Sequence, residues 1–145
     1  SNYVPRYFTH YNIVWERNPN FKVIEPIALD CIIKKISNYE TQLIFESFPA
    51  DKDFIADVVI DYQIDFNKSI YPIIGNRFLI NVRDSFKNDD NSLKVRSHYS
   101  ISPYANSSNL MLEHKSSDVK NILKIYTLPS NRTQLKINSC SAKIL

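Results

Sequence analysis

The chain has 145 residues, of which 43% are hydrophobic, 12% aromatic and 23% charged. These proportions favour one folded domain with one core and exclude an intrinsically disordered chain. No apolar run exceeds three residues, whereas a bilayer-spanning helix needs about twenty, so we expect no transmembrane segment. Gly75 is the single glycine. Dinucleotide-binding, P-loop and nucleophile-elbow motifs each need several glycines, so these enzyme classes are excluded.

The first twenty residues form an aromatic-rich arm whose structure the sequence leaves open. The aromatic residues of positions 5–17 fit one face of a helix, and Pro5 suits a first helical turn. Alternate residues of the same segment also fit one face of a strand, and they are types typical of strands, which we favour. They are Tyr7, Thr9, Tyr11, Ile13 and Trp15. We therefore divide a single domain, 1–145, into an arm (1–20) and a core (21–145).

The clearest strand signal lies between positions 56 and 66. Apolar residues occupy the even positions and mostly polar residues the odd ones, the pattern of a half-buried antiparallel strand. Asp57, Asp61 and Asp65 then form an acidic face. Residues four apart on a strand are separated by about 13 Å, which is too far for a glycosidase carboxylate pair. We interpret the acidic face as solvated.

Positions 77–86 repeat the alternation less cleanly, because Leu79 and Asp84 interrupt it. If this strand pairs with the preceding one, Arg77 and Arg83 share the outer face with the aspartates. Cross-strand charge pairs of this kind contribute a few tenths to about 1 kcal/mol.

Other strand signals are separated by proline-, asparagine- and aspartate-rich turns. They cover positions 21–33, 43–48, 93–101, 109–113, 121–128 and 133–145. In the first of these, Pro26 indicates a bulge or a sheet edge. Eight or nine short strands spaced by turns predict an all-β antiparallel sandwich, and a helix in the arm would change the class to α+β.

Two cysteines, Cys31 and Cys140, are either buried thiols or a disulfide that joins an early strand to the last one. Such a bond closes a loop of about 110 residues and contributes about 4–5 kcal/mol in the loop-entropy model. It would indicate an oxidising compartment, so we expect an extracytoplasmic protein: secreted, periplasmic or surface-exposed. Because the chain begins at Ser1 and its one methionine is Met111, we also expect a processed product.

Charge is distributed unevenly along the chain. Residues 1–90 carry ten Lys and Arg against thirteen Asp and Glu, a balance of −3, and residues 91–145 carry eight against two, a balance of +6. Oppositely charged halves suit a polar partner or head-to-tail self-association. The basic residues that we expect on one partner-binding face are Lys94, Arg96, His98, Lys124 and Lys136. Tyr99 alternates with the first three and is expected to face the apolar side.

These patterns predict a non-enzymatic protein-interaction or structural module of an exported protein, one part of a larger assembly, with no cofactor. The histidines lack zinc-ligand spacing and the aspartate clusters lack EF-hand spacing, so we expect no metal. One alternative is a β-barrel that binds single-stranded nucleic acid on the basic face. A second is a small enzyme that brings a cysteine to His10, His98 or His114 in the fold.

Overall fold

The structure, a computed structural model, describes residues 3–8, 13–17, 20, 25–48, 52–65, 80–128 and 133–145. Among these residues there is no helix, and therefore none long and apolar enough to cross a membrane. The strands are β1 (Tyr3–Phe8), β2 (Ile13–Arg17), β3 (Ala28–Leu29), β4 (Ile32–Lys35), β5 (Glu40–Phe45), β6 (Phe54–Asp65), β7 (Ile80–Lys87), β8 (Leu93–Ile101), β9 (Ser107–His114), β10 (Lys120–Tyr126) and β11 (Gln134–Ile144).

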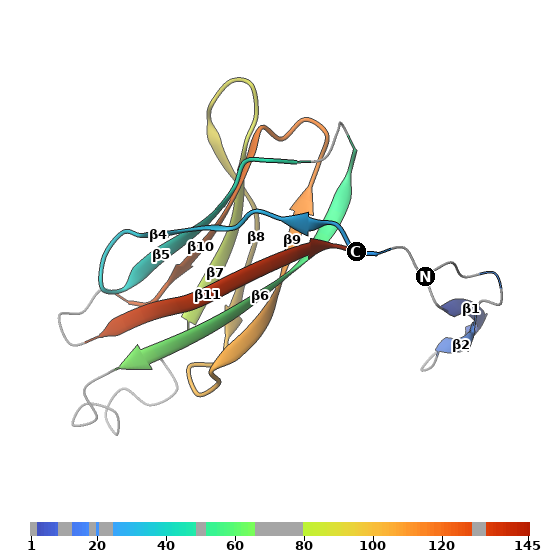
Figure 1. Cartoon of the computed structure of the whole chain (residues 1–145), viewed down its shortest axis with the longest axis horizontal. Helices are drawn as coiled ribbons and strands as arrows, with labels where there is room; N and C mark the ends of the chain where they lie inside the picture. The colour runs from blue at the N-terminus through green and yellow to red at the C-terminus, as the bar shows by residue number, and fades with distance from the viewer. Residues whose placement is uncertain are drawn as a thin grey trace.

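Among the described residues, nine strands form two antiparallel sheets that pack face to face. The five-stranded sheet has the order β4-β5-β10-β7-β8 and the four-stranded sheet the order β3-β11-β6-β9. Figure 1 shows β11 and β6 of the second sheet in front of the first. The predicted sandwich is confirmed. β1 and β2 pair antiparallel, so the arm contains strand, as we favoured, where the structure describes it.

The core forms where the inward faces of the two sheets meet, and β6 shows how the sequence builds it. Its even positions from Ala56 to Tyr62 are buried, and Phe54 and Ile64 at its ends are half-buried. Its three aspartates lie on the other side, Asp57 half-buried and Asp61 and Asp65 exposed. Each fully buried large apolar side chain contributes about 1.5–3 kcal/mol. The largest buried core side chains include Tyr62, Phe45, Leu43, Ile60, Ile80, Leu110, Leu112, Leu123, Ile125 and Leu135.

The predicted pairing of positions 56–66 with 77–86 is wrong, because β6 and β7 belong to different sheets. The aspartates of β6 therefore have no arginine neighbours from β7. Asp57 accepts hydrogen bonds from Asn109 Nδ2 on β9 (3.1 Å), and Asp61 accepts one from Ser139 Oγ on β11 (2.7 Å). The side-chain hydrogen bonds to Asp57 and Asp61 thus come from neutral groups, and the cation nearest Asp57 in the register is Lys143 of β11, which lies opposite it. Arg77, Leu79 and the loop between the two strands lie outside the described residues, as do positions 49–51 and 129–132.

Positions 21–33 do not form the single strand that we predicted. Residues 25–27 are not strand, β3 pairs with β11, and β4 pairs with β5 in the opposite sheet. The chain changes sheets at Asp30 and Cys31, so Ile27 and Ile33 are 53% and 39% exposed instead of sharing the buried face of Leu29. One edge of the sandwich is closed by this crossing.

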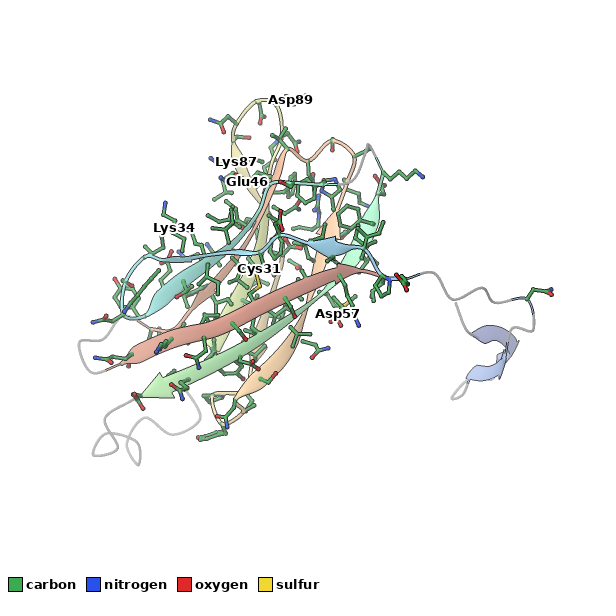
Figure 2. All side chains as sticks on the ribbon, viewed as in Figure 1. Cys31, Lys34, Glu46, Asp57, Lys87 and Asp89 are labelled. Carbon is green, nitrogen blue, oxygen red and sulfur yellow. A yellow bond between two sulfur atoms is a disulfide. The ribbon has the colours of Figure 1, made fainter. Side chains whose placement is uncertain are left out.

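The predicted disulfide is confirmed and lies at the same closed edge. Cys31, in the crossing segment, is bonded to Cys140 on β11, 109 positions away in sequence. Figure 2 shows Cys31 where the chain passes between β3 and β4. Both cysteines pack against the core. A covalent bond therefore ties the crossing segment to the four-stranded sheet.

The opposite edge of the sandwich is formed by β8 and β9, the outermost strands of the two sheets on that side. The two strands follow one another in the chain, joined through residues 102–106 at one end. At the other end, residues 115–119 connect β9 to β10 of the five-stranded sheet. We call this side the open edge.

Candidate functional site

A cleft of about 370 Å³ lies at the open edge, between β9 and the inner side of the five-stranded sheet. We call it the edge cleft. Its lining comes from both sheets, with side chains of β7 and β8 on one side and residues of β6 and β9 on the other. The lining residues are Ile55, Asp84, Ser97, Tyr99, Asn109, Met111 and Glu113.

Asp84 is the most unusual residue of the edge cleft. It follows Ile80 and Val82 on the inward face of β7. Strand alternation predicts an apolar residue at this position. The residue is only 1% exposed, and its Oδ1 has no hydrogen-bond partner. Burial raises the pKa of Asp84 to about 6, although Arg96 and the Glu113 backbone amide offset part of the rise. Perturbed carboxyls in clefts are typical of functional sites.

The raised pKa means that Asp84 destabilises the free protein at neutral pH. The folded state binds this proton more tightly than the unfolded state, so stability falls as pH rises from about 4 to about 6, by up to about 3 kcal/mol. We expect Asp84→Asn to raise the free energy of unfolding by about 1–3 kcal/mol at pH 7.5, with little gain at pH 4.

Urea unfolding of the wild type and the variant at both pH values measures this effect. Asp61→Asn is the matched control, because Asp61 is an exposed strand aspartate on the outer face of β6. Its effect at pH 7.5 should stay within about 0.5 kcal/mol. A loss of stability in Asp84→Asn at pH 7.5 would contradict the assignment of Asp84 as an unfavourable buried charge.

The remaining walls of the edge cleft are largely apolar. Tyr99 lies on the core side of β8, as predicted from the alternation. Its hydroxyl is buried without a well-formed hydrogen bond, and burial raises its pKa to about 12, with a small opposing effect from the Met111 backbone amide. Ile55 and Met111 are 46% and 52% exposed. A ligand in this cleft would meet a largely apolar lining that also contains the Asp84 carboxyl.

The backbone of β9 faces the edge cleft at alternate residues. The carbonyl of Glu113 accepts hydrogen bonds from Arg96 and from Asn121 Nδ2 (3.1 Å), which belong to the opposite sheet. Backbone direction alternates along a strand, so the N–H and C=O groups of Asn109 and Met111 also point away from β6. These groups have no strand partner among the described residues. They form a hydrogen-bonding edge that is free of a neighbouring strand, on which the Met111 amide also lies near the Tyr99 hydroxyl.

The two strands of the open edge differ in how well they are protected from pairing. β8 contains a bulge, because Asp84 pairs with Ser97 and Ser85 with Val95, and it also carries Lys94. Bulges and edge lysines are common devices against unwanted strand pairing. β9 pairs with β6 without a register shift, and its residues 107–112 include no lysine, arginine or proline. β9 is therefore the accessible edge.

A buried polar network closes one end of the edge cleft. Arg96 donates two hydrogen bonds to the Asp118 carboxylate, at 2.9 and 3.2 Å. Asn121 Nδ2 donates to the same carboxylate (3.1 Å) and its Oδ1 contacts His114 Nδ1 (2.8 Å). Burial raises the pKa of Asp118, but the hydrogen bonds from Arg96, the Lys115 amide and Asn121 outweigh it, so the net pKa is lowered. The network therefore links β8 and β10 to the segment that connects β9 with β10.

The structure does not bring the five predicted basic residues together. Lys136 lies on β11 in the four-stranded sheet, while the other four lie in the five-stranded sheet. Arg96 is the residue left unpaired by the bulge in β8, and its side chain, only 15% exposed, turns inward to Asp118. Lys94 pairs with Asp90 in the adjacent turn, at 3.4 Å. The predicted basic stripe of β8 is therefore wrong.

His98 and Lys124 do meet, around Tyr126 on the outer face of the five-stranded sheet. Arg83 Nη2 donates to the Tyr126 hydroxyl (3.3 Å), which also contacts His98 Nε2 (3.1 Å). Lys124 Nζ lies 5.2 Å from the ring centroid and 3.0 Å from Glu40. Since aromatic and carboxylate partners already engage these side chains, this face is not a free basic surface.

The residues of the hypothetical enzyme are also separated. Both cysteines are in the disulfide, so neither thiol is free to act as a nucleophile. His114 is stacked against both Phe48 and Phe54, with ring centroids 3.9 and 4.6 Å away. His10 lies outside the described residues. Within the part of the chain that the structure describes, no three His, Cys, Asp or Glu side chains are grouped closely enough to hold a metal ion.

No protein-family model matches the chain, and no curated protein matches it either. Sequence analysis missed the edge cleft, although the sequence contained one signal of it, namely an aspartate that interrupts the apolar positions of β7.

Proposed function

We propose that the domain is a non-enzymatic protein-interaction module that binds an extended segment of a partner protein along β9. The observation that carries the proposal is the free backbone edge at Asn109 and Met111, which lies beside a cleft that contains a buried, unpartnered carboxyl oxygen. When a strand adds to a sheet edge, backbone hydrogen bonds supply affinity and alternate side chains supply specificity.

The contacts around β9 define how much of the strand is available. The carbonyl of Glu113 is already occupied by Arg96 and Asn121, so the incoming segment would pair with residues 107–111. Alternate side chains of that segment would then point between the two sheets, toward Asp84 and Tyr99. The other edge of the sandwich is closed by the crossing chain and the disulfide, which supports β9 as the binding edge.

The disulfide also supports the location that we propose for the domain. A bond between residues 109 positions apart is typical of secreted, periplasmic or surface-exposed proteins. An edge open to strand addition suits one component of a larger assembly in such a compartment, because the partner supplies the missing strand.

A matched pair of variants at position 109 tests strand addition. Ten-residue peptides from a random display library would first be selected on the wild-type domain. Asn109→Pro removes the backbone N–H at the free edge, so we expect it to weaken peptide binding by at least about tenfold. Asn109→Ala keeps the N–H and loses the same side-chain contact to Asp57, so it should bind within about threefold of wild type. Fluorescence polarisation measures both affinities.

Amide hydrogen exchange provides the second measurement. A bound peptide should protect the amides of Asn109 and Met111 more than those of the outer face of the five-stranded sheet. Peptides that bind Asn109→Pro as well as Asn109→Ala, or a selection that yields no binder, would rule out the proposed binding mode.

A further inference from the structure

We infer that the segment bound along β9 carries a lysine whose ammonium group pairs with Asp84 inside the edge cleft. This inference rests on the proposed function and specifies the chemistry of its partner. It is drawn from the pairing of the charged groups around the cleft, the shape of its walls and the unoccupied oxygen of Asp84.

The charged groups around Asp84 leave one carboxylate without a cation. Arg96, from β8, is held by Asp118, with a nitrogen–oxygen distance of 2.9 Å. Glu113, from β9, is paired with Lys115 at 2.8 Å on the solvent side. Among the described residues Asp84 has no salt-bridge partner, although Arg96 acts on it at longer range, and its Oδ1 is buried without a hydrogen-bond partner. Because an unpaired buried carboxylate is costly, a cation brought by the partner would relieve that cost.

The shape of the edge cleft favours lysine over arginine. One carboxylate oxygen is unoccupied and the Tyr99 hydroxyl lies in the same lining, so a compact ammonium can be satisfied there. A guanidinium has five donors in a planar fork and would leave several of them unpaired. Ile55 and Met111 supply apolar surface for the methylene stem of the lysine side chain.

The test uses the peptides selected on the wild-type domain. We expect lysine to be enriched at one position, and its replacement by norleucine, which removes the charge but keeps the stem, to weaken binding by about tenfold. On Asp84→Asn the same replacement should change affinity less than about twofold, because the two changes act on one contact. With the control variant Asp61→Asn, replacing the peptide lysine by norleucine should weaken binding as much as it does with the wild-type domain.

The affinity of a lysine peptide should also depend on pH. Since the pKa of Asp84 is about 6, the carboxylate is mostly protonated at pH 5, and binding should be about tenfold weaker there than at pH 7.5. Arg96, Glu113 and Asp118 also face Asp84, and His114 lies beyond Asp118. The Asp84→Asn variant separates their contribution, because it should lose most of the pH dependence.

A small probe checks the cleft directly. n-Butylammonium chloride should shift the amide resonances of Asp84, Tyr99 and Met111 in the wild type and not in Asp84→Asn, while n-butanol should shift none of them. Equal effects of norleucine on wild type and Asp84→Asn, or tighter binding by arginine peptides, would overturn the lysine assignment. If Asn109→Pro still blocks binding in that case, strand addition stands and only the partner's side chain is wrong.

Discussion

Replacing Arg96 with methionine is expected to lower the free energy of unfolding by about 3–5 kcal/mol, because it leaves the Asp118 carboxylate buried without its cation. The Asp118 side chain has no exposed surface, and Arg96 is its one ion-pair partner of fixed charge among the described residues. The guanidinium also lies 4.1 Å from the Phe86 ring and donates to the Glu113 carbonyl. Methionine retains much of the apolar part of the arginine side chain, so the loss of unfolding free energy reports on the charge and its hydrogen bonds.

Urea denaturation of Arg96→Met, Asp118→Asn, Arg96→Met/Asp118→Asn and the control Lys94→Met measures the effect. Lys94 lies two residues away on β8, but its pair with Asp90 is exposed to solvent on both sides, so Lys94→Met should change stability by less than about 1 kcal/mol. The double variant should lose less than the sum of its parts, since neutral asparagine needs no cation. A loss in Arg96→Met as small as that in Lys94→Met would refute the structural role of the pair.

The sequence predicted the faces of strands well and their neighbours poorly, and β6 shows why. Alternation follows from side-chain direction on one strand, so the buried even positions and the outward aspartates were predictable. The partner of β6 depends on which sheet each strand joins. Strands adjacent in sequence are neighbours roughly two-thirds of the time, and β6 and β7 are an exception.

One-residue irregularities account for the wrong prediction on β8. Strict alternation places Lys94, Arg96 and His98 on one face. The bulge leaves Arg96 opposite no residue of β7, and its side chain turns inward to Asp118. Nothing in the local sequence marks the bulge, because the reason for it, a buried carboxylate 22 positions later, is distant in the chain.

Asp84 illustrates a signal that was present but incomplete. Its place among the apolar residues of β7 could be read from the sequence, yet a polar residue at such a position also fits a register slip or a strand end. The fold decides between these, since β7 continues to Lys87 and the carboxyl stays inside. The cleft itself combines residues of four strands, and no local pattern predicts that combination.

Removing the disulfide is expected to lower the free energy of unfolding by about 4–5 kcal/mol, as the chain-entropy model gives for a loop of this length. The bond joins residues 109 positions apart, Cys31 in the crossing segment and Cys140 on β11. Beyond the entropy of the unfolded chain, it holds the crossing segment, where β3 makes only two register pairs with β11. The closed edge of the sandwich therefore depends on it.

Urea unfolding of Cys31→Ala/Cys140→Ala, compared with the wild type in the presence and absence of a reducing agent, measures this loss. The reduced wild type should unfold at nearly the same urea concentration as the double variant, and the reducing agent should leave the double variant unchanged. Since small domains are stable by only about 5–15 kcal/mol, a loss of this size would remove a large part of that stability in a reducing compartment, which is a physical reason for the location that we propose outside the cytoplasm. A loss below about 1 kcal/mol would remove that physical reason for placing it there.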